Sequence, residues 1–176
     1  MNHTRTASFI LGAAAAAFSM LAAGQQPGGL AQQDRAFMEN AIQGSYAEIE
    51  ASQLALKKDS SPDVRAFANT MISDHGKMVE EARTLAQQKG YTPPDGPSVL
   101  QKGEATALKT LSGGAFDAAY VNRIGVAAHE STVQQFQQAD QEVQDPDIKA
   151  MIRKALPKLQ EHLRMARALD AKQDAQ

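Results

Sequence analysis

Apolar residues recur every three or four positions along most of this chain, and charged residues fill the opposite side of each repeat. This spacing places the apolar residues on one face of an α-helix, the face that packs against the rest of a protein. It is sustained over four long stretches, residues 34–58, 62–89, 115–143 and 146–172. The pattern therefore predicts a fold made of four long amphipathic helices.

Capping residues support these boundaries. Ser61–Pro62 and Asp145–Pro146 each pair a hydroxyl or carboxylate that can cap a helix with a proline at its first position. Asp34 is the expected N-cap of the first helix. Pro157 lies inside the last helix and is expected to kink it, because proline cannot donate the backbone hydrogen bond.

The connections predict how the helices are arranged. The first and second helices, and the third and fourth, are separated by only a few residues, so each pair should form an antiparallel hairpin. Residues 90–114 join the two pairs and contain a short amphipathic segment. We therefore expect an all-α, ferritin-like four-helix bundle in which a long crossover containing a short helix joins two hairpins. A plain up-down-up-down bundle is the alternative.

The N-terminal segment has a different character. Residues 1–24 combine Arg5, an apolar run and the small residues Ala22, Ala23 and Gly24, which is the layout of a secretory signal peptide. An uncleaved anchor is the alternative. Residues 25–33 are expected to form a flexible linker, and residues 34–172 the bundle domain. These features predict a periplasmic or secreted protein.

No other stretch is long and apolar enough to cross a bilayer, so no integral membrane span is expected after cleavage. Peripheral association with the cell envelope stays open. The net charge of −2 excludes a broad basic surface for nucleic acid. The chain has no cysteine, which excludes disulfides and thiolate metal sites. Nothing in the sequence indicates the oligomeric state.

Each predicted helix places one side chain that can bind a metal on or beside its apolar face. These side chains are Glu48, His75, His129 and His162. Within each predicted hairpin the two residues lie at similar distances from the connecting loop, so all four can meet in one layer at mid-bundle. Such a convergence would be informative, because a buried carboxylate or imidazole is costly unless it is paired.

Two interpretations of this layer follow. Three imidazoles and a carboxylate suit one divalent metal ion, with zinc or copper favoured over iron or manganese. Asp74, next to His75, could then orient a ligand from behind, or could be a solvated residue on the helix flank. Alternatively, Glu48 accepts hydrogen bonds from two histidines in a metal-free network. Asp117 and Tyr120 are expected to form a separate hydrogen-bonded pair near one end of the bundle.

Three motifs are similar to those of a known family. They are Met71–His75, Phe116–Tyr120 with His129 downstream, and Leu156–His162. They resemble an exported bacterial family catalogued as domain of unknown function 4142, whose members are often labelled outer membrane proteins. The resemblance covers about residues 34–170. It implies a ferritin-like bundle in the bacterial envelope, and it supplies no function, because the family has no settled one.

Ferritin-like di-iron proteins carry a glutamate three residues before a metal-binding histidine on two of their helices. The residues three before the histidines here are Ile72, Val126 and Leu159. We therefore expect no di-iron centre. The sequence also contains no recognisable nucleophile or second polar cluster, which disfavours an enzyme. The remaining hypotheses are storage, buffering or sensing of a metal, and a metal-free structural or stress-related envelope protein acting through partners.

Overall fold

The computed structural model describes residues 29–58 and 60–175. The predicted signal peptide at 1–24, and residues 25–28 of the predicted linker, lie outside this part of the chain. Every regular element that the structure describes is helical, which confirms the all-α prediction. The elements are α1 (Gln32–Lys57), α2 (Pro62–Gln88), α3 (Val99–Lys109), α4 (Gly113–Tyr120), the π-helix η1 (Val121–Ala128), α5 (His129–Glu142) and α6 (Pro146–Asp174).

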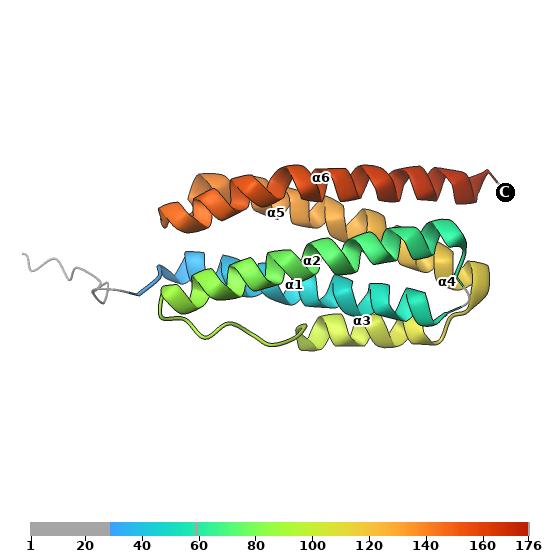
Figure 1. Ribbon diagram of the computed structural model, residues 1–176, viewed down its shortest axis with the longest axis horizontal. Helices are drawn as coiled ribbons and strands as arrows, with labels where there is room; N and C mark the ends of the chain where they lie inside the picture. Colours follow the sequence, from blue (N-terminus) through green and yellow to red (C-terminus); the bar gives the residue numbers. More distant parts are fainter. Residues whose placement is uncertain (1–28, 59, 176) are drawn as a thin grey trace, which may run out of the picture.

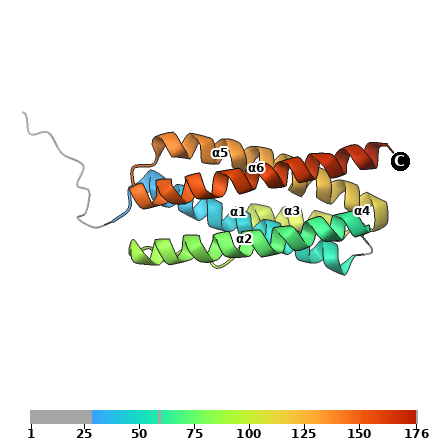
Figure 2. The ribbon, with the colours of Figure 1, turned by 45° about the horizontal axis from the view of Figure 1, so that its top comes forward.

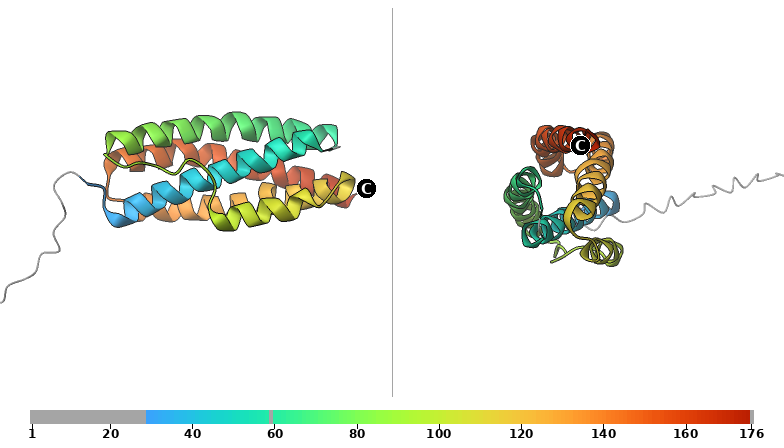
Figure 3. Two further views of the ribbon diagram at one scale, coloured as in Figure 1. Left: turned by 90° about the horizontal axis from the view of Figure 1, so that it is seen from below. Right: turned by 90° about the vertical axis from the view of Figure 1, so that its right-hand side faces the viewer.

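The long helices lie side by side as two hairpins (Figures 1 and 2). One hairpin is formed by α1 and α2, and the other by α6 and the continuous α4–η1–α5 segment. The link after α2 returns along the bundle into α3, which packs outside the bundle against α1 (Figure 3). As a result, α2 and α5 run in the same direction. None of the helices described is long and apolar enough to cross a membrane.

The predicted caps of α2 and α6 are confirmed. The Ser61 hydroxyl accepts a hydrogen bond from the Val64 N–H, and the Asp145 carboxylate accepts from the N–H groups of Asp147 and Ile148. These bonds satisfy backbone donors that the first helical turn leaves free. Pro157 lies within α6, which extends past it to Asp174.

The predicted cap of α1 is wrong. The helix begins before Asp34, at Gln32, and its N-cap residue Ala31 makes no side-chain hydrogen bond. The buried Asp34 carboxylate instead accepts hydrogen bonds from the backbone N–H groups of Gln144, at 3.1 Å, and Asp145, at 2.8 Å. Asp34 therefore ties the start of α1 to the loop between α5 and α6.

Two apolar clusters fill the interior. The first, here the Phe136 cluster, consists of Met38, Ile42, Ala82, Ala86, Tyr91, Val133, Phe136, Ala139, Val143, Ile148, Ile152 and Leu159. The second, here the Tyr120 cluster, consists of Ala51, Ala55, Val64, Phe67, Ala68, Met71, Leu108, Phe116, Tyr120, Val121, Ile124 and Ala166. Removal of these side chains from water supplies most of the driving force for folding.

The four predicted site residues occupy the layer between the clusters. Along each long helix, one of them separates members of the Phe136 cluster from members of the Tyr120 cluster. Glu48 on α1, His75 on α2, His129 at the start of α5 and His162 on α6 are all buried. The fold therefore encloses one polar layer between two apolar ones.

The third long helix contains a feature that the periodicity did not predict. Its middle part, Val121–Ala128, is π-helical. Gly125 in this segment faces α6 so closely that a Cβ atom built there would lie 2.9 Å from the Ala166 Cβ. Glycine is needed here because a methyl group would displace one helix from the other.

Candidate metal centre

The three histidines of the buried layer lie together. Their ring centroids are 5.5 Å apart for His75–His129, 5.2 Å for His75–His162 and 5.4 Å for His129–His162. One ring nitrogen from each lies within 4.8 Å of the other two, and all three residues are 0% exposed. The histidines come from α2, α5 and α6, so the folded bundle brings together residues that are far apart in the sequence.

His75 and His129 point toward one another. The His75 Nε2 and His129 Nε2 atoms are 3.4 Å apart. The other nitrogen of His75, Nδ1, lies 2.9 Å from the Glu48 Oε2 atom. The other nitrogen of His129, Nδ1, lies 3.0 Å from the backbone carbonyl oxygen of Ile124. Each ring thus has one nitrogen against an oxygen acceptor and one nitrogen facing the other ring.

His162 completes the group in a similar way. Its Nε2 atom lies 3.0 Å from the Asp74 Oδ2 atom, which reaches across from α2 to α6. Its Nδ1 atom is buried and has no hydrogen-bond partner among the described residues. Of the two interpretations of Asp74 from the sequence, contact with a histidine is the one that the geometry supports. That histidine is His162 on another helix, and not the adjacent His75.

The oxygen partners determine where the protons lie. A carboxylate and a backbone carbonyl can only accept hydrogen bonds, so the ring nitrogen that faces each of them must carry the proton. Neutral His75, His129 and His162 are therefore protonated at Nδ1, Nδ1 and Nε2, respectively. Their remaining nitrogens each hold a lone pair in a buried space. Three such lone pairs repel one another unless a cation or a shared proton lies between them.

The electrostatics of Glu48 favour its ionised form. Burial opposes ionisation of this carboxyl group, but the positive potential of His75 and His129 and the hydrogen bond from His75 outweigh it, so the pKa of Glu48 is lowered. Its Oε1 atom also lies 3.7 Å from the His129 Nδ1 atom. Glu48 thus places a negative charge beside two of the three imidazoles.

His162 is held in its neutral form. Burial lowers the pKa of His162 to about 4, although the hydrogen bond to Asp74 acts in the opposite direction. For Asp74 itself, burial raises the pKa, but the hydrogen bond from His162 and the charge of Lys158 outweigh burial. The pKa of Asp74 is therefore lowered. At neutral pH the pair is a neutral imidazole donating to a carboxylate, the arrangement commonly seen behind metal-bound histidines.

The structure changes the interpretation of Glu48. The sequence predicts Glu48 as one of four metal ligands, whereas the residues whose donor atoms converge are the three histidines. Glu48 lies behind His75, against its outer nitrogen. The helical spacing predicts that Glu48 is buried, but it cannot show which atoms of the neighbouring rings the carboxylate meets.

The predicted Asp117–Tyr120 pair is wrong. The buried Tyr120 hydroxyl shares a hydrogen bond of 2.7 Å with the Ser52 hydroxyl of α1, and Ser52 also donates to the Glu48 carbonyl. Asp117 accepts a hydrogen bond from the Ser61 N–H at the start of α2. The two side chains therefore fasten the α4 segment to the first hairpin at different places.

The sequence matches the family described as domain of unknown function (DUF4142) over residues 19–169. The chain belongs to this family. No curated protein matches the sequence. The family assignment agrees with the resemblance carried by the motifs around His75, Tyr120 and His162, and it brings no established activity with it.

Two solved structures show the same fold. The DUF305 fragment from Deinococcus radiodurans superposes with a TM-score of 0.71 at 14% sequence identity, covering 82% of this chain and 99% of that one. A conserved hypothetical protein from Mycobacterium tuberculosis superposes with a TM-score of 0.60 at 19% identity, covering 78% of this chain and 91% of that one. At these identities the likeness concerns the fold alone.

Proposed function

We propose that the protein binds one divalent metal ion through His75 Nε2, His129 Nε2 and His162 Nδ1. The observation that carries this proposal is the arrangement of the outer nitrogens. All three face oxygen acceptors, which leaves three inward lone pairs in a space enclosed by apolar clusters. The Nδ1 atom of His162 has no hydrogen-bond partner in the part of the chain that the structure describes, and burying it so is costly without such a cation.

The closest pair of nitrogens already has the spacing of a metal site. Two ligands at about 2.0–2.1 Å from a tetrahedral ion lie about 3.3–3.4 Å apart. The His75 and His129 Nε2 atoms are separated by 3.4 Å. One ring nitrogen of each histidine lies within 4.8 Å of the other two, so the three rings are close enough to share one ion.

Glu48 and Asp74 act as outer-shell acceptors in this proposal. Each holds the proton of one histidine and fixes the ring, and the two negative charges balance the charge of a divalent ion. Three neutral imidazoles favour zinc or copper over iron or manganese, and no di-iron centre is proposed. Three protein ligands also leave a fourth coordination position for water or another small ligand.

The proposal also includes a ferritin-like topology and a location outside the cytoplasm. The order of the two hairpins, with a crossover that makes α2 and α5 parallel, supports a ferritin-like topology. The signal-like segment at 1–24 supports export to the periplasm, with peripheral envelope contact as one arrangement there. In that compartment a bundle with a single metal site would serve storage, buffering or sensing of the metal.

Elemental analysis of tag-free protein tests the proposal. After loading with zinc and desalting, we expect about one equivalent of metal, and His162→Ala should abolish it. Glu48→Gln should retain the stoichiometry but weaken affinity about 10–100-fold, as expected for an outer partner. Gln138→Ala, on the exposed face of α5, is the matched control. Wild-type protein with well under one equivalent would contradict the proposal.

The alternative is a metal-free network in a structural or stress-related envelope protein acting through partners. The position of Glu48 favours it, because its carboxylate lies 2.9 Å from the His75 Nδ1 atom and 3.7 Å from the His129 Nδ1 atom and so faces two histidines at once. This alternative predicts that neither zinc nor EDTA changes the melting temperature. Metal binding predicts a rise of several degrees at zinc concentrations 100-fold above Kd, since such binding adds about 2.7 kcal/mol.

A further inference from the structure

The proposed ligands are sealed from solvent. His75, His129 and His162 are each 0% exposed, and the Phe136 and Tyr120 clusters cover the layer on both sides along the bundle axis. A metal ion that reaches them must therefore approach from the side of the bundle, between helices. Any such route should end at side chains that contact the histidines directly.

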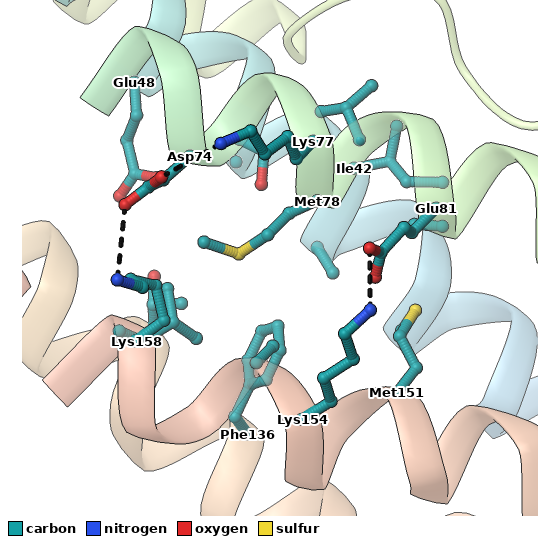
Figure 4. A pocket seen from close by; sticks show the side chains of 18 of the residues that line it. Ile42, Glu48, Asp74, Lys77, Met78, Glu81, Phe136, Met151, Lys154 and Lys158 are labelled. Carbon is teal, nitrogen blue, oxygen red and sulfur yellow. Dashed lines mark hydrogen bonds and ion pairs between the residues drawn. The ribbon is translucent and has the colours of Figure 1, made fainter. Parts of the chain in front are cut away.

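One cavity meets this condition. It has a volume of about 200 Å³ and lies between the α1–α2 hairpin and the α5–α6 hairpin (Figure 4). Glu48 and Asp74 form part of its lining, and these are the residues bonded to His75 and His162. Its walls are mainly apolar, and Met78 extends from α2 into the space between the hairpins.

The cavity opens between α2 and α6. Exposed Lys77, Glu81 and Lys154 belong to its lining there, and an ion pair of 2.7 Å joins Lys154 to Glu81 across the opening. The apolar middle therefore connects a charged rim to the buried carboxylate of Glu48 and the half-buried carboxylate of Asp74. An apolar passage that ends on carboxylates suits a cation better than an anion.

We propose that this cavity is the uptake route for the divalent metal ion, and that the Glu48 and Asp74 carboxylates form its first binding site inside the protein. The inference rests on the proposed function and adds to it a transfer step. An arriving ion exchanges bound water for carboxylate oxygens, and then for the inward nitrogens of His75 and His162. No proton has to leave the histidines, because their inward nitrogens already hold lone pairs.

The lysines near the cavity do not close it to cations. The Lys154 charge is paired with Glu81, and Lys77 lies 3.9 Å from Asp74. Lys158 lies 3.7 Å from Asp74 and 2.9 Å from Glu161. Of these lysines, Lys158 competes most directly with an incoming ion for the Asp74 carboxylate, so its charge should slow uptake.

Stopped-flow absorbance with Co²⁺ alone as the probe tests the route. Met78→Trp fills the cavity and should slow cobalt association at least tenfold, while the final stoichiometry stays that of wild type. Met78→Ala is the matched control at the same position and should not slow association. Lys158→Gln should accelerate association about two- to fivefold by freeing Asp74.

The outcomes separate the two proposals. Wild-type protein that binds no cobalt or zinc would overturn the proposed function. Wild-type binding with unchanged association rates in Met78→Trp and Lys158→Gln would overturn the uptake route alone. If Met78→Trp does not fold by circular dichroism, Lys158→Gln decides, because its faster association requires Asp74 to lie on the path.

Discussion

The two apolar halves of the bundle are packed differently. Around the Tyr120 cluster, Gly125 lets the π-helical segment approach Ala166 of α6 until no methyl group would fit between them. Around the Phe136 cluster, the hairpins are separated by a cavity of about 200 Å³ and are linked over it by the pairing of Lys154 with Glu81. The histidine layer lies between the half with this close helix contact, here called the packed half, and the half with this cavity, here called the hollow half.

This difference suggests a division of roles. The packed half holds His129, because the Ile124 carbonyl that fixes its ring belongs to the same π-helical segment. The hollow half contributes the two carboxylates, which line the cavity as well as contacting histidines. Protein interiors are close-packed as a rule, so a void beside a buried polar layer calls for a reason. Rigidity on one side and access on the other would serve a buried binding site.

The largest expected effect is a loss of stability when either of two phenylalanines, one in each half of the bundle, is replaced by alanine. Phe67 and Phe136 each form an edge-to-face pair, with Tyr120 and Phe37 respectively, in opposite halves. Phe67→Ala should lower the free energy of unfolding by about 3–5 kcal/mol, the usual cost for a packed aromatic residue. Phe136→Ala should cost about 1–2 kcal/mol less, because Phe136 already borders a cavity. Chemical denaturation of metal-free protein measures both, and equal losses would contradict the comparison.

The layer between the halves should make stability depend on pH. The pKa of His162 is about 4 in the folded protein and about 6.5 in an ordinary setting, so unfolding takes up a proton between these values. Metal-free protein should keep its full stability above pH 6.5 and lose roughly 3 kcal/mol as the pH falls to 4. The loss of Glu48 ionisation follows only below its ordinary value of 4.5. His162→Gln should flatten the dependence between pH 6.5 and 4.5, and an unchanged slope would count against a neutral, buried His162.

A smaller effect is expected from the close contact in the packed half. Gly125→Ala should destabilise the protein by about 1–2 kcal/mol, because its Cβ would meet the Ala166 Cβ. Ala166→Gly in the same chain should recover much of the loss by making room. Denaturation of both single variants and the double variant measures this coupling. Simple additivity of the two losses would show that the helices adjust freely there.

The smallest expected effect is a gain in the hollow half. Ala155 is half-buried on α6 and lines the cavity, so Ala155→Leu should stabilise the protein by about 0.5–1 kcal/mol. The same change at the fully buried Ala166, which faces Gly125, should destabilise it. Thermal unfolding of the two variants compares the halves with one substitution. A loss of stability at both positions would mean that the cavity is not free to accept a side chain.

Much of the fold was predictable because its signals are local. Ser61–Pro62 and Asp145–Pro146 act on the helix turn that follows them, and the apolar spacing reports directly which helix face is buried. The N-cap predicted at Asp34 is wrong, because the partners of this carboxylate are the backbone N–H groups of Gln144 and Asp145. No local pattern connects residues so far apart.

The candidate site was predictable in part for a related reason. Helical spacing identified Glu48, His75, His129 and His162 as buried or nearly so, and their distances from the loops placed them at one level. The spacing could not show that Glu48 meets the outer nitrogen of His75, because this depends on how each ring is turned. It also could not reveal the π-helix, since a change in backbone hydrogen bonding leaves no mark in residue types.

The π-helical turn before His129 has an evolutionary consequence. Each residue in an α-helix advances the chain by about 100° around the axis. A π-helix advances the chain by less than this per residue, so a return of 121–128 to α-helical geometry at its present length would rotate His129 away from its two neighbours, and the loss of one residue at the same time would turn it back toward them. A single-codon deletion in 121–128 would thus convert the segment to an α-helix and keep both the binding site and the scaffold, so relatives with an ordinary α-helix here should be one residue shorter in this segment.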